Sequence, residues 1–292
     1  MYTGLVAFQI LIRKGVCAMS QSIRGFHKAL VIFIDILGSQ NRKDFNELYE
    51  INNTFHDLLL DNQKCNKPRV VYKRTIHTFS DCAYIIYDFK DDIPEEKRDL
   101  GKLFEVALCN CEPLAIQFLN RNFIFRGGVA YGDVYYEENR NILFGPGINA
   151  AYQLESKVAQ YPRIAVENFV AETIQEHWDR TVREMDNPQN DKEKNIYRLF
   201  GNLKKVQGCI VKRDFDGICM MHYLNSIEIN CSNASFINKS NEEFLQSCVE
   251  FCKQQIEENK ENLHITQKYD WLLSYIISAY SCFEHKMYGE IL

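Results

Sequence analysis

The sequence predicts an α+β fold in which a mostly antiparallel sheet carries helices on one face. Strand-like and helical patterns follow one another in the order β-α-β-β-α-β, a tight connection joins the second and third strands, and there are no internal repeats or coiled-coil patterns. This order is typical of the split βαβ, or ferredoxin-like, plan. Further helical patterns at the C-terminal end predict extra helices beyond that plan.

The first four elements carry clear periodicities. Residues 28–36 (ALVIFIDIL) are a short apolar run that is typical of a buried strand. Residues 42–62 place Phe and Leu at helical spacing, which predicts an amphipathic helix. Residues 69–78 and 82–89 are rich in β-branched and aromatic residues, and the short FSD connection between them predicts a hairpin with Asp81 at its tip.

The later elements are predicted in the same way. A helix is expected at about 98–120, and FIFRGGVAYGDVYYE is expected to form a strand interrupted by glycines. GPGINAAYQLESKVAQ opens with Gly-Pro-Gly and continues as a helix. RIAVE predicts a short strand, 168–186 a helix, GCIVKRDFDGICMMHYL a final hairpin, and 241–290 a pair of helices.

Three segments are expected along the chain. Residues 1–25 are interpreted as an N-terminal extension outside the fold, because Met19 begins a stretch that leads directly into the first strand. Residues 26–230 hold the main domain with the candidate site, and residues 231–292 form a helical appendage that packs on this domain or on a dimer. A length of 292 residues suits one large domain with such an appendage.

Composition disfavours several classes of protein. The net charge of -5 and the pI of about 5.9 disfavour nucleic-acid binding. The 11 cysteines are scattered without a CxxC pair, as expected of reduced thiols in a cytoplasmic protein. The N-terminal apolar run carries its charges after it and is too short to span a bilayer, so neither a secretory signal nor a membrane anchor is expected.

Two aspartates mark the candidate site. Asp35 ends the first strand and Asp81 lies at the hairpin tip, and these strands are neighbours in a β-α-β-β plan. Two carboxylates that share a site repel each other unless a cation intervenes, and Mg²⁺ bound to nucleotide phosphates uses one or two protein carboxylates. The turn with Gly38 and Ser39 leads into a helix N-terminus, where free N–H groups favour phosphate.

Four motifs in this order resemble those of class III nucleotidyl cyclases. FIDILGS resembles the metal-binding first strand of that family, and TFSDCAYIIY resembles its hairpin, with Ser80 where the family usually has Gly. FRGGVAYGDV resembles the next strand, and GPGINAAYQLES resembles the signature helix G-x-x-V-N-x-A-x-R-L-E. The resemblance covers about residues 28–225 and implies the cyclase catalytic domain, in its ferredoxin-like form.

The resemblance implies a homodimer with its active sites at the interface. Asp35, Ile36 and Asp81 of one subunit would bind two Mn²⁺ or Mg²⁺ ions, and Asn149 of the other subunit would orient the ribose. Arg126 would be a second catalytic residue. In the family, the 3′-hydroxyl attacks the α-phosphorus and diphosphate leaves, which is a two-metal phosphoryl transfer. Ordinary structural roles stay open: a helix cap for Asp35, a turn residue for Asp81 and an ion pair for Arg126.

Gln153 departs from the family pattern. At this position, four residues after the signature Asn, the family usually has an Arg that stabilises the α-phosphate. Because Gln is neutral, another cation must supply that charge. The candidates are Arg126 and, in the final hairpin where the family often places a phosphate-binding Lys, Lys212 and Arg213. The alternative for the last two is that they are solvated hairpin charges.

The base-recognition positions also differ. Adenylate cyclases carry Lys and Asp where this chain has His77 and Ile142, and the Glu and Cys of guanylate cyclases match neither. Ile142 cannot accept a hydrogen bond from the exocyclic amine of adenine, so the pocket should not prefer ATP. His77 offers a donor or an acceptor to a base, depending on its tautomer, and Tyr49 of the first helix is within possible reach. Both have ordinary structural alternatives.

With these divergent motifs the chain most resembles the Pycsar pyrimidine cyclases of bacterial antiviral defence. The resemblance implies that a pyrimidine nucleoside triphosphate is converted to cyclic CMP or cyclic UMP, with CTP favoured over UTP, and that a separate effector senses the product. Two alternatives remain. One is an adenylate or guanylate cyclase with a changed base pocket, and the other is an inactive nucleotide-binding regulator.

Overall fold

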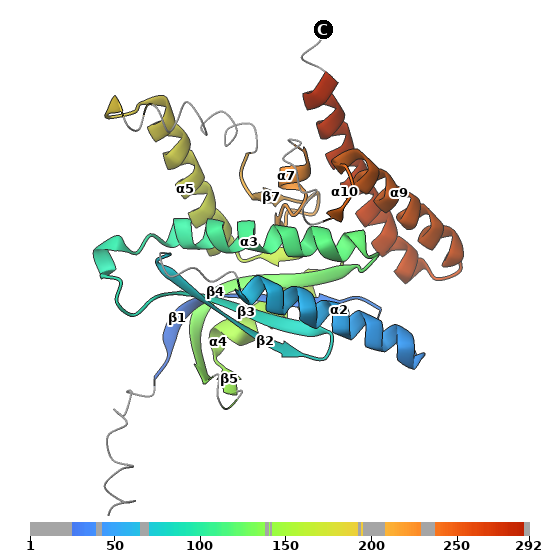
Figure 1. Ribbon diagram of the computed structural model, residues 1–292, viewed down its shortest axis with the longest axis horizontal. Coiled ribbons are helices and arrows are strands. Elements are labelled where there is room, and N and C mark those ends of the chain that lie inside the picture. Colours follow the sequence, from blue (N-terminus) through green and yellow to red (C-terminus); the bar gives the residue numbers. More distant parts are fainter. Residues whose placement is uncertain are drawn as a thin grey trace, which may run out of the picture.

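The computed structural model describes residues 25–38, 43–64, 70–137, 140, 142–191, 194, 208–228 and 237–288. Most of the expected N-terminal extension, residues 1–24, lies outside this part of the chain, and so does Ser39. Helices surround one large sheet, as Figure 1 shows. The prediction of an α+β fold is therefore confirmed at the level of fold class.

One sheet organises the described part of the chain. Its strands are β1 (His27–Ile36), β2 (Tyr72–Phe79), β3 (Cys82–Phe89), β4 (Phe125–Glu137), β5 (Ile142–Phe144), β6 (Ile164–Val166), β7 (Val211–Arg213) and β8 (Cys219–Met221). The strand order is β2-β3-β1-β4-β6-β8-β7, with β5 paired to β4. β1 pairs antiparallel with both β3 and β4, and β2 forms the predicted hairpin with β3. The sheet therefore places the end of β1 beside the β2–β3 turn.

Both faces of β1 are buried, which explains its nearly continuous apolar sequence. Leu30, Ile32 and Ile34 point to one face and join the main core. Val31 and Phe33 point to the other face and join a second, smaller cluster. Because successive side chains of a strand alternate between faces, each apolar residue of β1 enters one of the two cores.

Helices cover both faces of the sheet, whereas the sequence pattern had predicted helices on one face. α2 (Phe45–Lys64) and α3 (Leu100–Asn120) lie over the main core, and α4 (Pro146–Gln153) lies on the opposite face (Figure 1). The prediction of one covered face was wrong because β4 is apolar on its second face as well. Ala130 and Val134 of β4 are fully buried there, against Ile148 and Ala151 of α4.

The C-terminal helices share the main core with the sheet and its helices. α9 (Asn241–Glu258) begins with a capping box between Ser240 and Glu243, and α10 (Leu263–Tyr288) runs back along it. Tyr275 of α10 is 6% exposed, and its hydroxyl accepts a hydrogen bond from the N–H of Leu224, at 3.2 Å. This contact ties α10 to the segment that follows β8.

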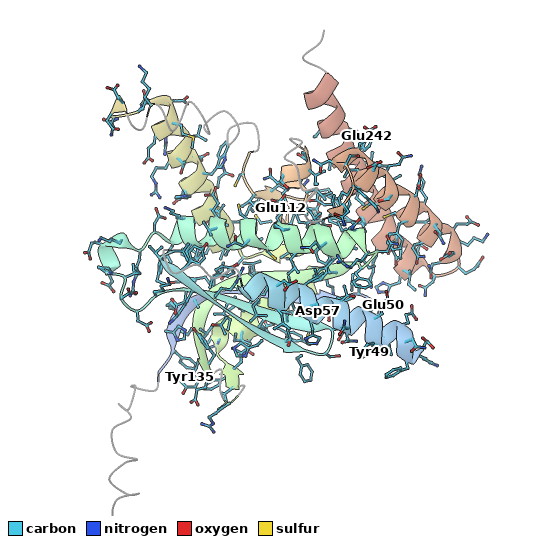
Figure 2. The ribbon with its side chains drawn as sticks, viewed as in Figure 1. Tyr49, Glu50, Asp57, Glu112, Tyr135 and Glu242 are labelled. Atoms are coloured by element: carbon cyan, nitrogen blue, oxygen red, sulfur yellow. The ribbon has the colours of Figure 1, made fainter. Side chains whose placement is uncertain are left out.

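Two further helices complete the packing. α5 (Asn168–Asp186) packs against α3, and α7 (Asn225–Glu228) follows β8. Glu112 on α3 accepts a hydrogen bond from the N–H of Ser226, with 2.6 Å between the two atoms, and Figure 2 shows Glu112 on the α7 side of α3. Burial raises the pKa of Glu112, since the charged form loses water contacts.

A buried arginine joins the second half of the sheet to α10. Arg163, 1% exposed, forms ion pairs with Asp214 at 2.5 Å and with Asp216 at 2.6 Å, in the turn between β7 and β8. The indole N–H of Trp271 on α10 donates to the same Asp214 carboxylate, at 3.0 Å. Three segments that are distant in sequence therefore meet at one charge cluster.

We expect Arg163→Met to cost about 3–5 kcal/mol of unfolding free energy, because it leaves two partly buried carboxylates without their cation. Chemical denaturation monitored by circular dichroism measures the loss. The control is Arg140→Met, which removes an exposed ion pair with Glu137 and should cost about 1 kcal/mol or less. Equal losses in the two variants would contradict a structural role for the Arg163 cluster.

Candidate functional site

The candidate site begins with two carboxylates at one edge of the sheet. Asp35 is the last but one residue of β1, and Asp81 lies in the two-residue turn of the β2–β3 hairpin. The N–H of Ile36 donates to the carbonyl of Asp81, at 3.1 Å, so the hairpin turn is fixed against the end of β1. The predicted neighbourhood of these two residues is confirmed.

Asp35 lies close enough to Asp81 for the charge of Asp81 to change its pKa. Burial first, and then the Asp81 carboxylate, raises the pKa of Asp35 from 3.8 to about 6, while Arg126 lowers it in part. A carboxyl group with this pKa is poised between its two protonation states close to neutral pH. A nearby divalent cation would favour the ionised form, because it removes the repulsion between the two carboxylates.

Arg126 connects Asp35 to a third carboxylate. It lies opposite Asp35 in the register of β1 and β4, and its Nε is 3.7 Å from Asp35 Oδ2. The same Nε forms a close ion pair with Glu155, whose side chain is 2% exposed. Burial raises the pKa of Glu155 to about 7, although Arg126 partly offsets this. Arg126 is thus held between two carboxylates with raised pKa values.

Glu155 is a residue that the sequence-based site prediction missed. It follows α4, in a single π-helical turn over Leu154–Val158. The signal for it was present, since this Glu ends the segment GPGINAAYQLES that resembles the signature motif, between the apolar Leu154 and Val158. A buried Glu in such a pattern requires a cationic partner, and Arg126 is that partner.

Gly128 allows the end of α4 to approach β4. A Cβ atom at Gly128 would lie 2.1 Å from the carbonyl oxygen of Ala151 and 2.8 Å from the backbone nitrogen of Glu155. Only glycine has room here. The sequence suggested that glycines interrupt this strand. In the structure β4 is continuous, and its glycines let α4 and Glu155 lie directly on it.

A cavity of about 500 Å³ opens beside the two aspartates. One wall comes from the sheet edge, and the opposite wall comes from the end of α9 and the start of α10. The lining residues are Asp35, Ile36, Leu37, Gly38, Asp81, Ile124, Arg126, Gln255, Asn259, Asn262, His264, Ile265, Lys268 and Tyr269. Its volume falls in the range of small-molecule sites.

The structure brings five of the predicted site residues to this cavity. They are Asp35, Ile36, Gly38, Asp81 and Arg126. Gly38 has a φ of 89°, in the left-handed region that favours glycine, so the sharp turn after β1 depends on it. The sheet edge that the sequence singled out is therefore a continuous surface of one cavity.

The other predicted residues lie elsewhere on the chain. Asn149 and Gln153 are exposed on α4, one helical turn apart, and do not line the cavity. Tyr49 is exposed on α2 beside Phe45 and projects away from the sheet (Figure 2). His77, on the edge strand β2, lies edge-on to Tyr136 with 6.0 Å between the ring centres.

Lys212 and Arg213 line a second cavity of about 470 Å³, together with Trp271 and Tyr275. The ammonium group of Lys212 lies 4.4 Å from the centre of the Tyr275 ring, and burial lowers the pKa of Lys212. Arg213 donates to the carbonyl of Gly217 at 2.8 Å. Within one chain, these two cations are therefore not the ones that face Asp35 and Asp81.

The oxygen donors at the two aspartates suit a divalent cation that phosphates and water also coordinate. The described residues contain no group of three or more His, Cys, Asp or Glu side chains placed to hold a metal ion. Asp35 and Asp81, with the backbone carbonyl of Ile36, fit instead the type of site in which Mg²⁺ takes one or two carboxylates and completes its shell with phosphates and water. The mutual repulsion that raises the pKa of Asp35 is the observation that favours this fit.

Comparisons with known proteins do not place the chain in a family. No family model matches it, and no curated protein shows significant similarity to it. Among the helices of the described residues, none is long and apolar enough to cross a membrane. The cavity and the residues that line it are therefore the features that indicate a function.

Proposed function

We propose that the chain is a metal-dependent pyrimidine nucleotide cyclase that converts CTP to 3′,5′-cyclic CMP, or UTP to cyclic UMP, and releases diphosphate. The observation that carries this proposal is the pair of carboxylates, Asp35 and Asp81, at the wall of a nucleotide-sized cavity. Their adjacency on β1 and the β2–β3 turn is what the resemblance to class III cyclases requires.

The fold offers further support. The first four strands are all antiparallel and lie in the order β2-β3-β1-β4, with α2 and α3 as the two crossover helices. This is the strand order of a split βαβ domain. We propose that it is the ferredoxin-like catalytic domain of a cyclase, since the four resembling motifs fall on β1, the hairpin, β4 and α4 in the same order.

Asp35, Asp81 and the carbonyl of Ile36 would bind the metal ions. When bound, these ions would lower the pKa of the 3′-hydroxyl and neutralise charge on the phosphates. The reaction forms a bond between the 3′-oxygen and the α-phosphorus and breaks the bond from that phosphorus to the diphosphate oxygen, and the hydroxyl proton passes to solvent. In this reaction the protein mainly positions the reacting groups and stabilises charge, and it takes little part in the covalent chemistry.

Arg126 and Glu155 position the carboxylate pair. Arg126 contacts Asp35 on one side and Glu155 on the other, so its guanidinium is fixed and cannot swing out of the cavity freely. Its charge lowers the pKa of Asp35 and keeps more of that carboxyl group ionised. We infer that Arg126 prepares Asp35 for metal binding.

The proposal includes a homodimer. Asn149 and Gln153 are exposed on α4, on the face of the sheet opposite α2 and α3, where a second copy of the chain would reach them. In such a dimer Asn149 of one copy would meet the cavity of the other and orient the ribose. His77 and Tyr49 remain candidates for base recognition, and a separate effector would sense the cyclic product in antiviral defence.

A product assay tests the proposal. The full chain is incubated with Mn²⁺ and each of the four nucleoside triphosphates, and the products are identified by mass spectrometry. We expect cyclic CMP, or cyclic UMP, together with one equivalent of diphosphate. Cyclic AMP or cyclic GMP as the main product would contradict the pyrimidine assignment. Nucleotide binding without any cyclic product would favour the inactive regulator, which the neutral Gln153 also permits.

A further inference from the structure

We propose that Lys268 of α10 binds the phosphates of the substrate in the cavity beside Asp35 and Asp81, and so supplies the charge that Gln153 does not carry. This inference rests on the proposed function and goes beyond it, because it assigns a role to the C-terminal helices. It names a phosphate-binding residue outside the part of the chain that resembles a cyclase.

Lys268 faces the candidate site across the cavity. It lines the same wall as Asn259, Asn262 and His264, opposite Asp35 and Asp81. Arg126 lies near groups on both walls of the cavity, because its charge lowers the pKa of Asp35 and also the pKa of Lys268. Arg126 is therefore the neighbour that the carboxylates and Lys268 share, and the cavity lies among these groups.

The position of Lys268 on α10 is fixed by buried neighbours. Tyr269 and Leu272 on the same helix are 8% and 0% exposed, and both belong to the main core. Trp271, one turn further along the helix, is held by its hydrogen bond to Asp214. Because α10 cannot rotate without breaking these contacts, Lys268 stays at the edge of the buried face.

Among the described residues, the ammonium group of Lys268 has no anionic side-chain partner. It is half-buried, and no carboxylate of the described residues lies within ion-pair distance of it. Burial is the largest cause that lowers its pKa, followed by Arg126. A half-buried cation without a carboxylate gains most from a polyanionic ligand, because the ligand restores the interactions that burial removed.

The arrangement of charges suits a triphosphate with its metal ions. Two carboxylates at the sheet edge would take divalent cations, and Lys268 on the facing wall would take phosphate oxygens beyond them. His264, in the first turn of α10, borders the same cavity, and a helix N-terminus favours negative charge. The substrate would then bridge the sheet and the α9–α10 hairpin.

Binding measurements separate this role from a purely structural one. Wild type, Lys268→Gln, Lys268→Arg and the control Lys253→Gln are titrated by calorimetry with tripolyphosphate and with a non-hydrolysable α,β-methylene analogue of CTP, in Mg²⁺. Lys253 is exposed on α9 and does not line the cavity, so its replacement makes the same change of charge elsewhere on the hairpin. Melting temperatures of all four proteins report on folding.

We expect Lys268→Gln to weaken the binding of both ligands by roughly 10- to 100-fold, as the loss of a charge-assisted hydrogen bond predicts. Lys268→Arg should keep most of the affinity, and Lys253→Gln all of it. Wild-type affinity in Lys268→Gln would overturn the inference, and so would tighter binding, which would mean that Lys268 blocks the cavity. Wild-type protein that binds neither ligand would also overturn it.

The two proposals can fail separately. If Lys268→Gln binds as wild type does, but the four-nucleotide assay still yields a cyclic pyrimidine nucleotide, only the role of Lys268 is wrong. If binding depends on Lys268 but no cyclic product forms from any nucleotide, the cyclase function is wrong and the cavity is a phosphate-binding site of another kind.

Discussion

Asp35→Asn is expected to lower the rate of cyclic nucleotide formation by roughly 10³-fold, since it removes one of the two carboxylates that would hold the catalytic metal ions. The fold should survive, because Asn has the same shape and Asp35 is only partly buried at the end of β1. Initial rates with Mn²⁺ and CTP or UTP measure the effect. A variant that keeps the wild-type rate would exclude Asp35 as a metal ligand.

The same substitution should stabilise the metal-free protein at neutral pH. The pKa of Asp35 is about 6 in the folded chain and 3.8 as its ordinary value, so the folded state binds its proton more tightly. The stability that protonated Asp35 contributes is full below pH 3.8 and is lost as the pH rises through about 6. We expect Asp35→Asn to recover about 1–2 kcal/mol at pH 7.5, after a discount for solvent screening, and nothing below the ordinary pKa.

Two controls make the Asp35 result specific. Asp92→Asn makes the same chemical change at an exposed turn residue and should alter neither rate nor stability. Mn²⁺ should raise the melting temperature of wild type at pH 7.5 but not that of Asp35→Asn. An equal shift in both proteins would place the metal elsewhere.

Mixing inactive variants tests the shared active site. Asp35→Asn and Asn149→Ala should each be inactive alone, but an equal mixture of subunits would form heterodimers with one intact site. About one quarter of the wild-type activity should then return. No recovery after confirmed subunit exchange would show that both residues act within one chain, and would remove the dimer from the proposal.

Gly128→Ala is expected to destabilise the protein by about 3 kcal/mol or more, which is the upper end of the range for overpacking. The new Cβ would lie 2.1 Å from the carbonyl oxygen of Ala151 and 2.7 Å from the Cβ of Leu154. Neither atom belongs to a flexible side-chain end, so α4 must move away from β4 as a unit. That movement carries Asn149 and Glu155 with it, and catalytic activity should be lost as well.

The melting temperature of Gly128→Ala should fall by about 5 °C or more. Gly25→Ala is the matched control, because a Cβ at Gly25 meets no atom within 4 Å and should change stability by less than about 0.5 kcal/mol. If the two alanine variants melt together, the contact between α4 and β4 is loose and the close approach at Gly128 has no energetic importance.

Much of the sheet was predictable from local pattern. The apolar run of β1, the aromatic and β-branched hairpin and the Ser80–Asp81 turn each carry their signal within a few residues, and the structure has them within a few residues of the expected bounds. Strands that are joined by short loops can pair in only a few ways. This is why Asp35 and Asp81 were expected to lie close together.

The contacts around the site between elements that are distant in sequence were not predictable in this way. A helical period shows which face of α10 is buried, but not which other element covers that face. The same limit applies to Glu155, whose burial depends on Arg126 from another element, and to the second covered face of the sheet, which only the packing of α4 reveals. Lys212 and Arg213 sat in an expected hairpin, yet they line a different cavity.

The sequence by itself determined the α+β class, the order of the elements and the two aspartates at the sheet edge, because strand and helix periods and turn residues are local properties of the chain. Only the tertiary structure decided that Glu155 pairs with Arg126 and that Lys268 faces the two aspartates across a cavity. Those contacts join residues far apart in sequence, and they depend on which buried faces pack together, which no local pattern encodes.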